Sequence, residues 1–130
     1  MIEWISPQIF LGVEDFTASA SLMLETVNAT AASVVLISTG GRQDIVNLDC
    51  GGEILCAEGA HWGEAHHGRV SVHSPAGGTW FNLTLTRTKG QLTVHLDGVA
   101  ALSMPTTFSV KGLAIRPWRS TVHARELRVC

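Results

Sequence analysis

Apolar and polar residues alternate with a period of two along most of this sequence. The clearest stretch runs from Phe16 to Leu24, where every second residue is apolar and most of the residues between them are Thr or Ser. Successive side chains of a β-strand point to opposite faces, so this stretch predicts one long strand with a buried face. The same alternation over residues 81–86 and 92–96 predicts two more strands of this kind.

Shorter apolar stretches complete the set of predicted strands. Val34 to Ile37 is an unbroken apolar run rich in β-branched residues, which is typical of a strand covered on both faces. The dipeptide Asp97-Gly98 predicts a tight hairpin, because both central residues of a type I′ turn need positive φ. Further strands are expected at residues 45–48, 54–57, 99–104, 113–115 and 122–129.

All of the predicted elements are strands. Roughly ten or eleven of them follow one another at hairpin spacing, which is typical of a sandwich or a barrel. No segment has the apolar stripe of a helix, and the one long irregular segment, Glu58 to Gly68, contains three glycines that oppose a helix. Neither a repeat nor a linker interrupts the pattern, so we expect residues 1–130 to form one domain.

The composition narrows the classes of partner. Hydrophobic residues make up 45% of the chain and charged residues 15%, and the formal net charge is -2. Without a basic stripe to neutralise phosphates, no nucleic-acid partner is expected. No apolar run is long enough to span a bilayer, and the N-terminal residues lack the pattern of a signal peptide, so we expect no membrane partner. We expect a monomer or a homodimer, and the sequence leaves open whether the chain is one domain of a larger exported protein.

Cys50, Cys56 and Cys130 are expected to be free thiols. Their number is odd, and a Cys50–Cys56 bridge would need the chain to turn back sharply at Gly51-Gly52. Thiolate zinc sites use closely spaced cysteine pairs, and no Cys-x-x-Cys pair occurs. We therefore expect neither a metal nor a cofactor.

Several segments resemble the concanavalin A-like and laminin-G-like sandwich family, whose members often show an apolar-alternating strand ending in Thr-Arg and a second strand ending in Asp-Gly. The matching segments are Gly78–Arg87, Gly90–Gly98, Gly112–Thr121, Glu126–Val129 and Asp15–Ala20. The resemblance implies an all-β fold, a two-sheet antiparallel jelly-roll sandwich. It also implies a lectin-like function, since domains of this kind accompany bacterial hydrolases that act on complex glycans.

The motifs of the sugar-binding and catalytic members are incomplete here. Galectins share this architecture and use a His-x-Asn-x-Arg strand followed by a Trp-Gly-x-Glu segment. This chain has Asn47-Leu48-Asp49 near the first position and Trp62-Gly63-Glu64, one residue short, near the second. The glycosidase pattern Glu-x-Asp-x-x-Glu is absent, and an odd separation places Asp44 and Asp49 on opposite faces of a strand. We therefore expect no enzyme.

The densest polar cluster lies in the irregular segment. Residues 61–67 hold one Trp, one Glu and three His, but the glycines oppose the helical spacing that zinc-binding histidines need. A Trp ring offers an apolar face to a sugar ring, while Glu and His can hydrogen-bond its hydroxyls. We expect Trp62 to stack on a sugar, with His61, Glu64, His66 and Arg69 around it.

Trp118 marks a second candidate site. Its favoured interpretation is packing over the end of the sandwich, because large aromatic side chains are mostly buried. The alternative is an aromatic residue at the edge of a ligand site, with Arg116 and Arg119 as hydrogen-bonding forks. Trp4 and Trp80 are expected to have a packing role.

The preferred function is that of a non-catalytic carbohydrate-binding module for an oligosaccharide or polysaccharide, in keeping with an accessory domain of a glycan-acting hydrolase. A protein-interaction or oligomerisation sandwich is the alternative, and a small glycoside hydrolase is less favoured.

Overall fold

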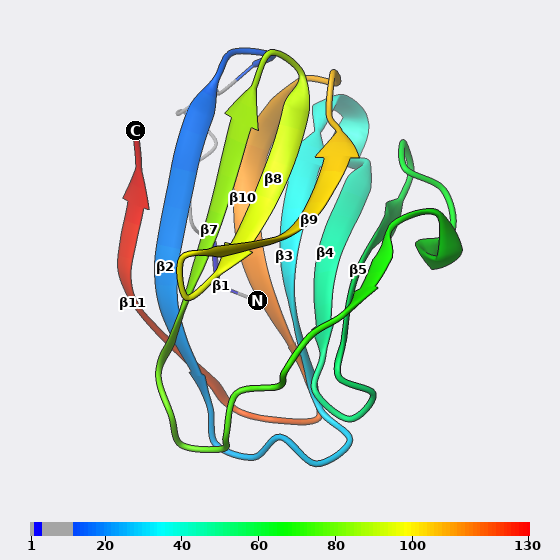
Figure 1. Cartoon of the computed structure of the whole chain (residues 1–130). Coiled ribbons are helices and arrows are strands. Elements are labelled where there is room, and N and C mark those ends of the chain that lie inside the picture. The colour runs from blue at the N-terminus through cyan, green and yellow to red at the C-terminus, as the bar shows by residue number, and fades with distance from the viewer. Residues whose placement is uncertain (1, 4–11) are drawn as a thin grey trace.

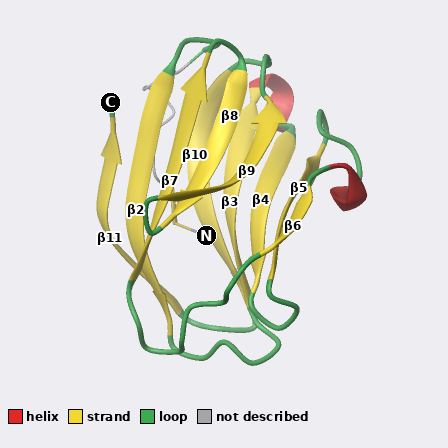
Figure 2. Ribbon diagram, viewed as in Figure 1, coloured by secondary structure: helices red, strands yellow, loops and turns green. Residues whose placement is uncertain are grey.

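The computed structural model describes residues 2–3 and 12–130, and most of these residues lie in β-strands (Figure 2). The strands form two antiparallel sheets that face each other across the core (Figure 1). This arrangement confirms the predicted two-sheet antiparallel sandwich. Trp4, which was expected to have a packing role, lies outside the described residues.

One sheet has six strands in the order β1–β10–β3–β4–β5–β6, and the other has five in the order β11–β2–β7–β8–β9. The strands of the first sheet are β1 (Ile2–Glu3), β10 (Val110–Trp118), β3 (Ala31–Ser38), β4 (Gln43–Asp49), β5 (Ile54–Gly59) and β6 (Arg69–Ser71). The strands of the second are β11 (Val122–Val129), β2 (Phe16–Leu24), β7 (Phe81–Thr88), β8 (Gln91–Leu96) and β9 (Val99–Pro105).

The alternation of apolar residues reproduces the inner face of the five-stranded sheet. Every apolar residue predicted to face inward on β2 is at most 4% exposed, and these side chains pack with those of β7 and β8 in the core cluster. The hairpin between β8 and β9 also forms as predicted, because Asp97 has φ 49° and Gly98 has φ 81°. The buried face of β2 and the β8–β9 hairpin could therefore both be predicted from the local sequence pattern.

The irregular segment is shorter than expected. Glu58 still pairs with Ile45 at the end of β5, and Arg69 already pairs with Cys56 as the first residue of β6. Only residues 60–68 lie between these strands, and the short 3-10 helix Ala65–His67 is part of this loop (Figure 2). Neither that helix nor the other one described, Thr39–Gly41, is long enough to cross a membrane.

Candidate ligand-binding groove

The outer face of the six-stranded sheet carries a groove with a volume of about 920 Å³. Strands β10, β3, β4 and β5 form its floor, and the loops at residues 28–30 and 51–52 close one end. A second hollow of about 360 Å³ shares Ile45, Glu58 and Arg116 with the groove and continues it towards the 60–68 loop. The residues that line the groove are Asn28, Ala29, Thr30, Ala31, Ser33, Ile45, Asn47, Asp49, Gly51, Gly52, Glu58, Arg116 and Trp118.

A row of paired residues crosses this face of the sheet. Its members, from β10 to β6, are Arg116, Ser33, Asn47, Cys56 and Arg69. Directly paired residues of antiparallel strands point to the same face, so all five side chains belong to the groove side. With strands about 4.8 Å apart, the row is about 19 Å long. Within it, the Ser33 hydroxyl donates a hydrogen bond to Asn47 Oδ1 at 2.7 Å.

Trp118 stands at the closed end of the groove with its ring accessible. It is 61% exposed, so the favoured interpretation of a buried plug over the sandwich is wrong. Its neighbour across the sheet is the small Ala31, which in turn pairs with Asp49. The Arg119 guanidinium lies 5.5 Å from the centre of the Trp118 ring. Arg116 and Trp118 therefore both line the groove, and Arg119 lies beside Trp118 without being one of the lining residues.

The charged side chains of the groove keep their hydrogen-bonding capacity. Arg116, Asp49 and Glu58 make no ion pair with any other side chain that the structure describes. Asp49 accepts one hydrogen bond, from the Gly52 amide at 3.1 Å. Guanidinium groups donate and carboxylates accept, so a ligand with several hydroxyls finds both kinds of partner here.

Asp49 and Glu58, the two carboxylates of the groove, lie far apart along the sheet. Asp49 pairs with Ile54, and Glu58 lies four residues further along the same strand. At about 3.4 Å per residue, the two positions are about 14 Å apart. The carboxyl groups of glycosidases lie about 5 to 9.5 Å apart, so the backbone positions of Asp49 and Glu58 are spaced more widely than such carboxyl groups are.

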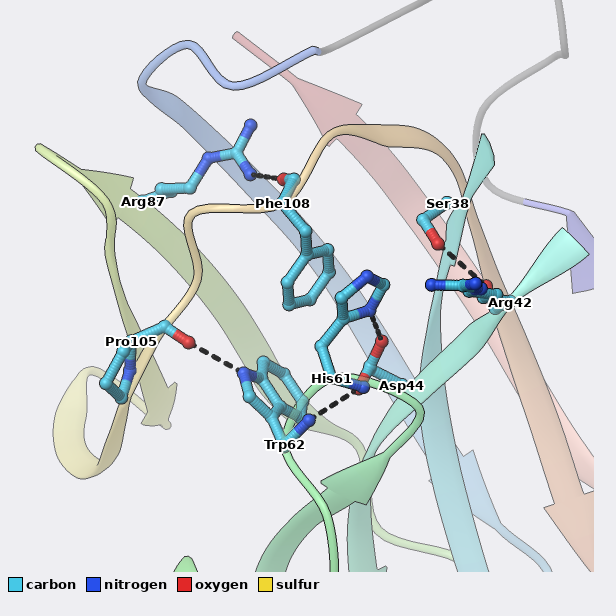
Figure 3. A network of polar contacts seen from close by, with 8 residues as sticks. All are labelled: Ser38, Arg42, Asp44, His61, Trp62, Arg87, Pro105 and Phe108. Atoms are coloured by element: carbon cyan, nitrogen blue, oxygen red, sulfur yellow. Dashed lines mark hydrogen bonds and ion pairs between the residues drawn. The ribbon is translucent and has the colours of Figure 1, made fainter. Parts of the chain in front are cut away.

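His61 and Trp62 contact the buried carboxylate of Asp44 and do not line the groove (Figure 3). Trp62 makes this contact through its backbone amide. Asp44 is fully buried, and its side chain accepts hydrogen bonds from the His61 amide at 2.7 Å and the Trp62 amide at 3.0 Å. His61 Nδ1 lies 2.7 Å from Asp44 Oδ2, and the ring stacks on Phe108 at 4.1 Å. These contacts fasten the 60–68 loop to β4.

Trp62 is a core residue. It is 8% exposed, belongs to the core cluster, and donates its indole N–H to the carbonyl of Pro105 at 2.8 Å (Figure 3). A ring buried in this way has no free face for a sugar, which differs from the stacking surface expected at this position. His61 and Trp62 do line a hollow of about 370 Å³ beside Phe108, but this hollow shares no residue with the groove.

The other residues expected in the site near Trp62 are Glu64, His66 and Arg69. Glu64 lines its open end, where the side chain is 83% exposed and lies 3.2 Å from His66 Nδ1. His66 is also exposed and packs against His67, with ring centres 4.0 Å apart. Arg69 stands at the far end of the cross-strand row. Among the described residues, no group of three or more His, Cys, Asp or Glu side chains is placed to hold a metal ion.

Ser33, Asn47, Asp49 and Glu58 are groove residues that the sequence analysis did not propose as site residues. Ser33 interrupts an apolar run, and Asn47 and Asp49 are polar residues two positions apart in an apolar strand. Residues two positions apart on a strand share one face, so this spacing indicated a polar patch on one face of the strand. Its meaning depends on which face of the sheet is open, and that follows only from the fold.

All three cysteines are free, as expected. Burial raises the pKa of the Cys50 and Cys56 thiols above their ordinary value of 9.0, whereas Cys130 is exposed. Because the thiolate is the reactive form, we expect the folded protein at about pH 8 to react with a thiol reagent quickly at Cys130 and slowly at the other two. The unfolded, unreduced protein should titrate three thiols, and a count of one would mean that Cys50 and Cys56 are bridged.

Neither the protein-family models nor the curated protein sequences contain a match to this sequence. Solved structures do match. The carbohydrate-binding module CBM66 from Bacillus subtilis superposes with a TM-score of 0.68 and 13% identity over 88% of this chain and 74% of that one. CG-16, a homodimeric agglutinin from chicken liver, superposes with a TM-score of 0.69 and 14% identity, over 95% of this chain and 96% of that one.

Congerin II in complex with lactose and MES gives a TM-score of 0.66 and 9% identity, over 93% of this chain and 98% of that one. At these identities the likeness concerns the fold. The chain has the jelly-roll fold of the concanavalin A-like lectins.

Proposed function

We propose that this protein binds an oligosaccharide or polysaccharide chain in the groove of the six-stranded sheet, without catalysis. The observation that carries the proposal is Trp118, an accessible indole at the end of a groove lined with polar side chains. The apolar face of a sugar ring stacks on such an indole, while the ring hydroxyls need both donors and acceptors nearby. Arg116 supplies donors and Asp49 supplies acceptors on the same face.

The structural neighbours support the same class of ligand. CBM66 is described as a carbohydrate-binding module, and congerin II was solved with lactose. The length of the cross-strand row, about 19 Å, exceeds that of a single sugar ring. We therefore favour a chain of several sugar units over a monosaccharide.

The test is a glycan array followed by calorimetry with the best ligand. We expect a dissociation constant between millimolar and micromolar for the wild type, and a loss of about tenfold or more in Trp118→Ala, the equivalent of about 1.4 kcal/mol. Arg116→Ala should weaken binding similarly, whereas Arg42→Ala, an exposed arginine outside the groove, should not.

Two results would contradict the proposal. Undiminished affinity in both groove variants would place the ligand elsewhere. A wild type that binds no glycan in a broad array would favour a protein-interaction domain.

A further inference from the structure

A second hollow, of about 270 Å³, lies on the outer face of the five-stranded sheet. Strands β2, β7 and β11 and the β8–β9 turn form it, and none of its residues lines the groove described above. The hollow and the groove lie on the outer faces of different sheets, so they open on opposite faces of the sandwich. The residues that line the hollow are Ser19, Ala20, Ser21, Asn82, Thr84, Gly98, Glu126 and Arg128.

We propose that this hollow is a second binding site, for a neutral molecule rich in hydroxyl groups such as a sugar. The proposal does not rest on the function of the groove. It rests on the polar groups of the hollow, on the backbone conformation of Glu126, and on the incomplete pairing of the charged side chains there.

The chemistry of the lining favours this class of ligand over the others. The lining holds one acidic and one basic side chain, Glu126 and Arg128, so their effects on a phosphate, a sulfate or a cation offset each other. An apolar ligand would leave the hydroxyl and amide groups of the lining without partners. A sugar hydroxyl both donates and accepts, so a sugar can pair with the carboxylate, the guanidinium, the serine and threonine hydroxyls, and the amide of Asn82.

Glu126 adopts a conformation that few residues other than glycine tolerate. Its φ is 57°, and it lies in a bulge where the pairing of β11 with β2 shifts between Arg125 and Arg128. Bulges redirect side chains, and strained residues concentrate at functional sites. Here the side chain reaches over β2 to the Ser21 hydroxyl, 3.3 Å from Glu126 Oε2.

The charged groups of the hollow are available to a ligand. Ser21 has one hydroxyl proton, and Asn82 Oδ1, at 2.7 Å, is a closer acceptor for it than Glu126 is. The Glu126 carboxylate therefore keeps most of its acceptor capacity. Arg128 makes no ion pair with any side chain in the described ranges, so its donors are available as well.

Together with the glycan site proposed in the groove, on which this consequence rests, a second site on the opposite face would let one molecule bridge two glycan chains. In that case the protein would cross-link a polysaccharide without forming a dimer, because each molecule would supply both contacts. Two weak sites on one protein also raise its overall affinity for a chain that reaches both of them.

The experiment is a titration of the ¹⁵N-labelled full chain, followed by NMR, with glucose, galactose and mannose as separate probes. We expect at least one of these sugars to shift the amide signals of Ser19, Ser21, Thr84 and Glu126, with saturation in the millimolar range. Glu126→Gly should weaken this binding about tenfold, because the carboxylate is lost. Its melting temperature should be unchanged or higher, since glycine adopts positive φ without steric cost.

Trp118→Ala is the matched control. It changes the groove only, so the shifts at Ser21 and Thr84 should persist in this variant. The second site is overturned if none of the three sugars causes saturable shifts there, or if Glu126→Gly binds as the wild type does. Shifts confined to Ser33 and Asn47 would overturn the second site while supporting the groove.

Discussion

The Arg87→Met variant should unfold about 10 °C below the wild type, with a loss of about 3 kcal/mol in the free energy of unfolding. Arg87 is fully buried, and burial lowers the pKa of its guanidinium. The guanidinium donates a hydrogen bond to the carbonyl oxygen of Phe108 at 3.0 Å (Figure 3). It also donates to the carbonyl oxygens of Glu14, at 3.0 Å, and Gly12. Methionine fills much of the same space but leaves these bonds unmade, and an unpaired buried carbonyl is costly.

Thermal unfolding followed by circular dichroism measures this effect, with Arg42→Met as the control. Arg42 is exposed, so removing its charge should change the free energy of unfolding by no more than about 0.5 kcal/mol. Arg87→Lys keeps the charge but loses the planar fork of donors, and it should recover only part of the stability. Equal melting temperatures for Arg87→Met and Arg42→Met would show that the three carbonyl contacts do not stabilise the fold.

The Trp62→Ala variant should lose about 3 to 5 kcal/mol in the free energy of unfolding, because it leaves a large cavity between the sheets. The indole also makes an edge-to-face contact with Phe108 at 5.8 Å, and its hydrogen bond to Pro105 would be lost. Urea unfolding measures the effect.

The control for this variant is Trp118→Ala, which removes a ring that is 61% exposed. This substitution should change the unfolding free energy by no more than about 0.5 kcal/mol. The two tryptophans thus separate stability from binding: one variant should weaken the fold, and the other should weaken the affinity for glycans. If Trp62→Ala retained full stability and lost glycan binding, Trp62 would be the sugar-stacking residue after all.

The strands were predictable because one face of each sheet is buried. Residues that point to this face are apolar, so apolar and polar residues alternate along each strand. The same period accounts for Arg87. Phe81, Leu83 and Leu85 face inward, and the next inward position is residue 87. The alternation of inward and outward side chains along β7 therefore places Arg87 inside the sandwich. The partners that make its burial tolerable are backbone carbonyls as many as 75 residues away, and no local pattern encodes them.

The candidate site was only partly predictable. A local cluster of His, Glu and Trp at residues 61–67 suggested a binding loop, but the buried Asp44, 17 residues before His61, draws the first part of that loop inward. Arg116 and Trp118 do line the groove, together with Ser33 and Asn47 from other strands. Their proximity follows from the register of β10, β3 and β4, which depends on contacts between distant parts of the chain.

The insertion of β10 between β1 and β3 bears on how the protein acquires its groove during synthesis. Strand β3, at residues 31–38, gains this neighbour only when residues 110–118 have been made, and β2 gains β11 later still. A nascent chain that stops before residue 116 already contains Ser33, Asn47 and Asp49 but has neither Arg116 nor Trp118. Chains dominated by such distant pairings fold in milliseconds to seconds, because the loops between the strands must close first. The capacity to bind a ligand in the groove should therefore arise late, when the last two strands join their sheets.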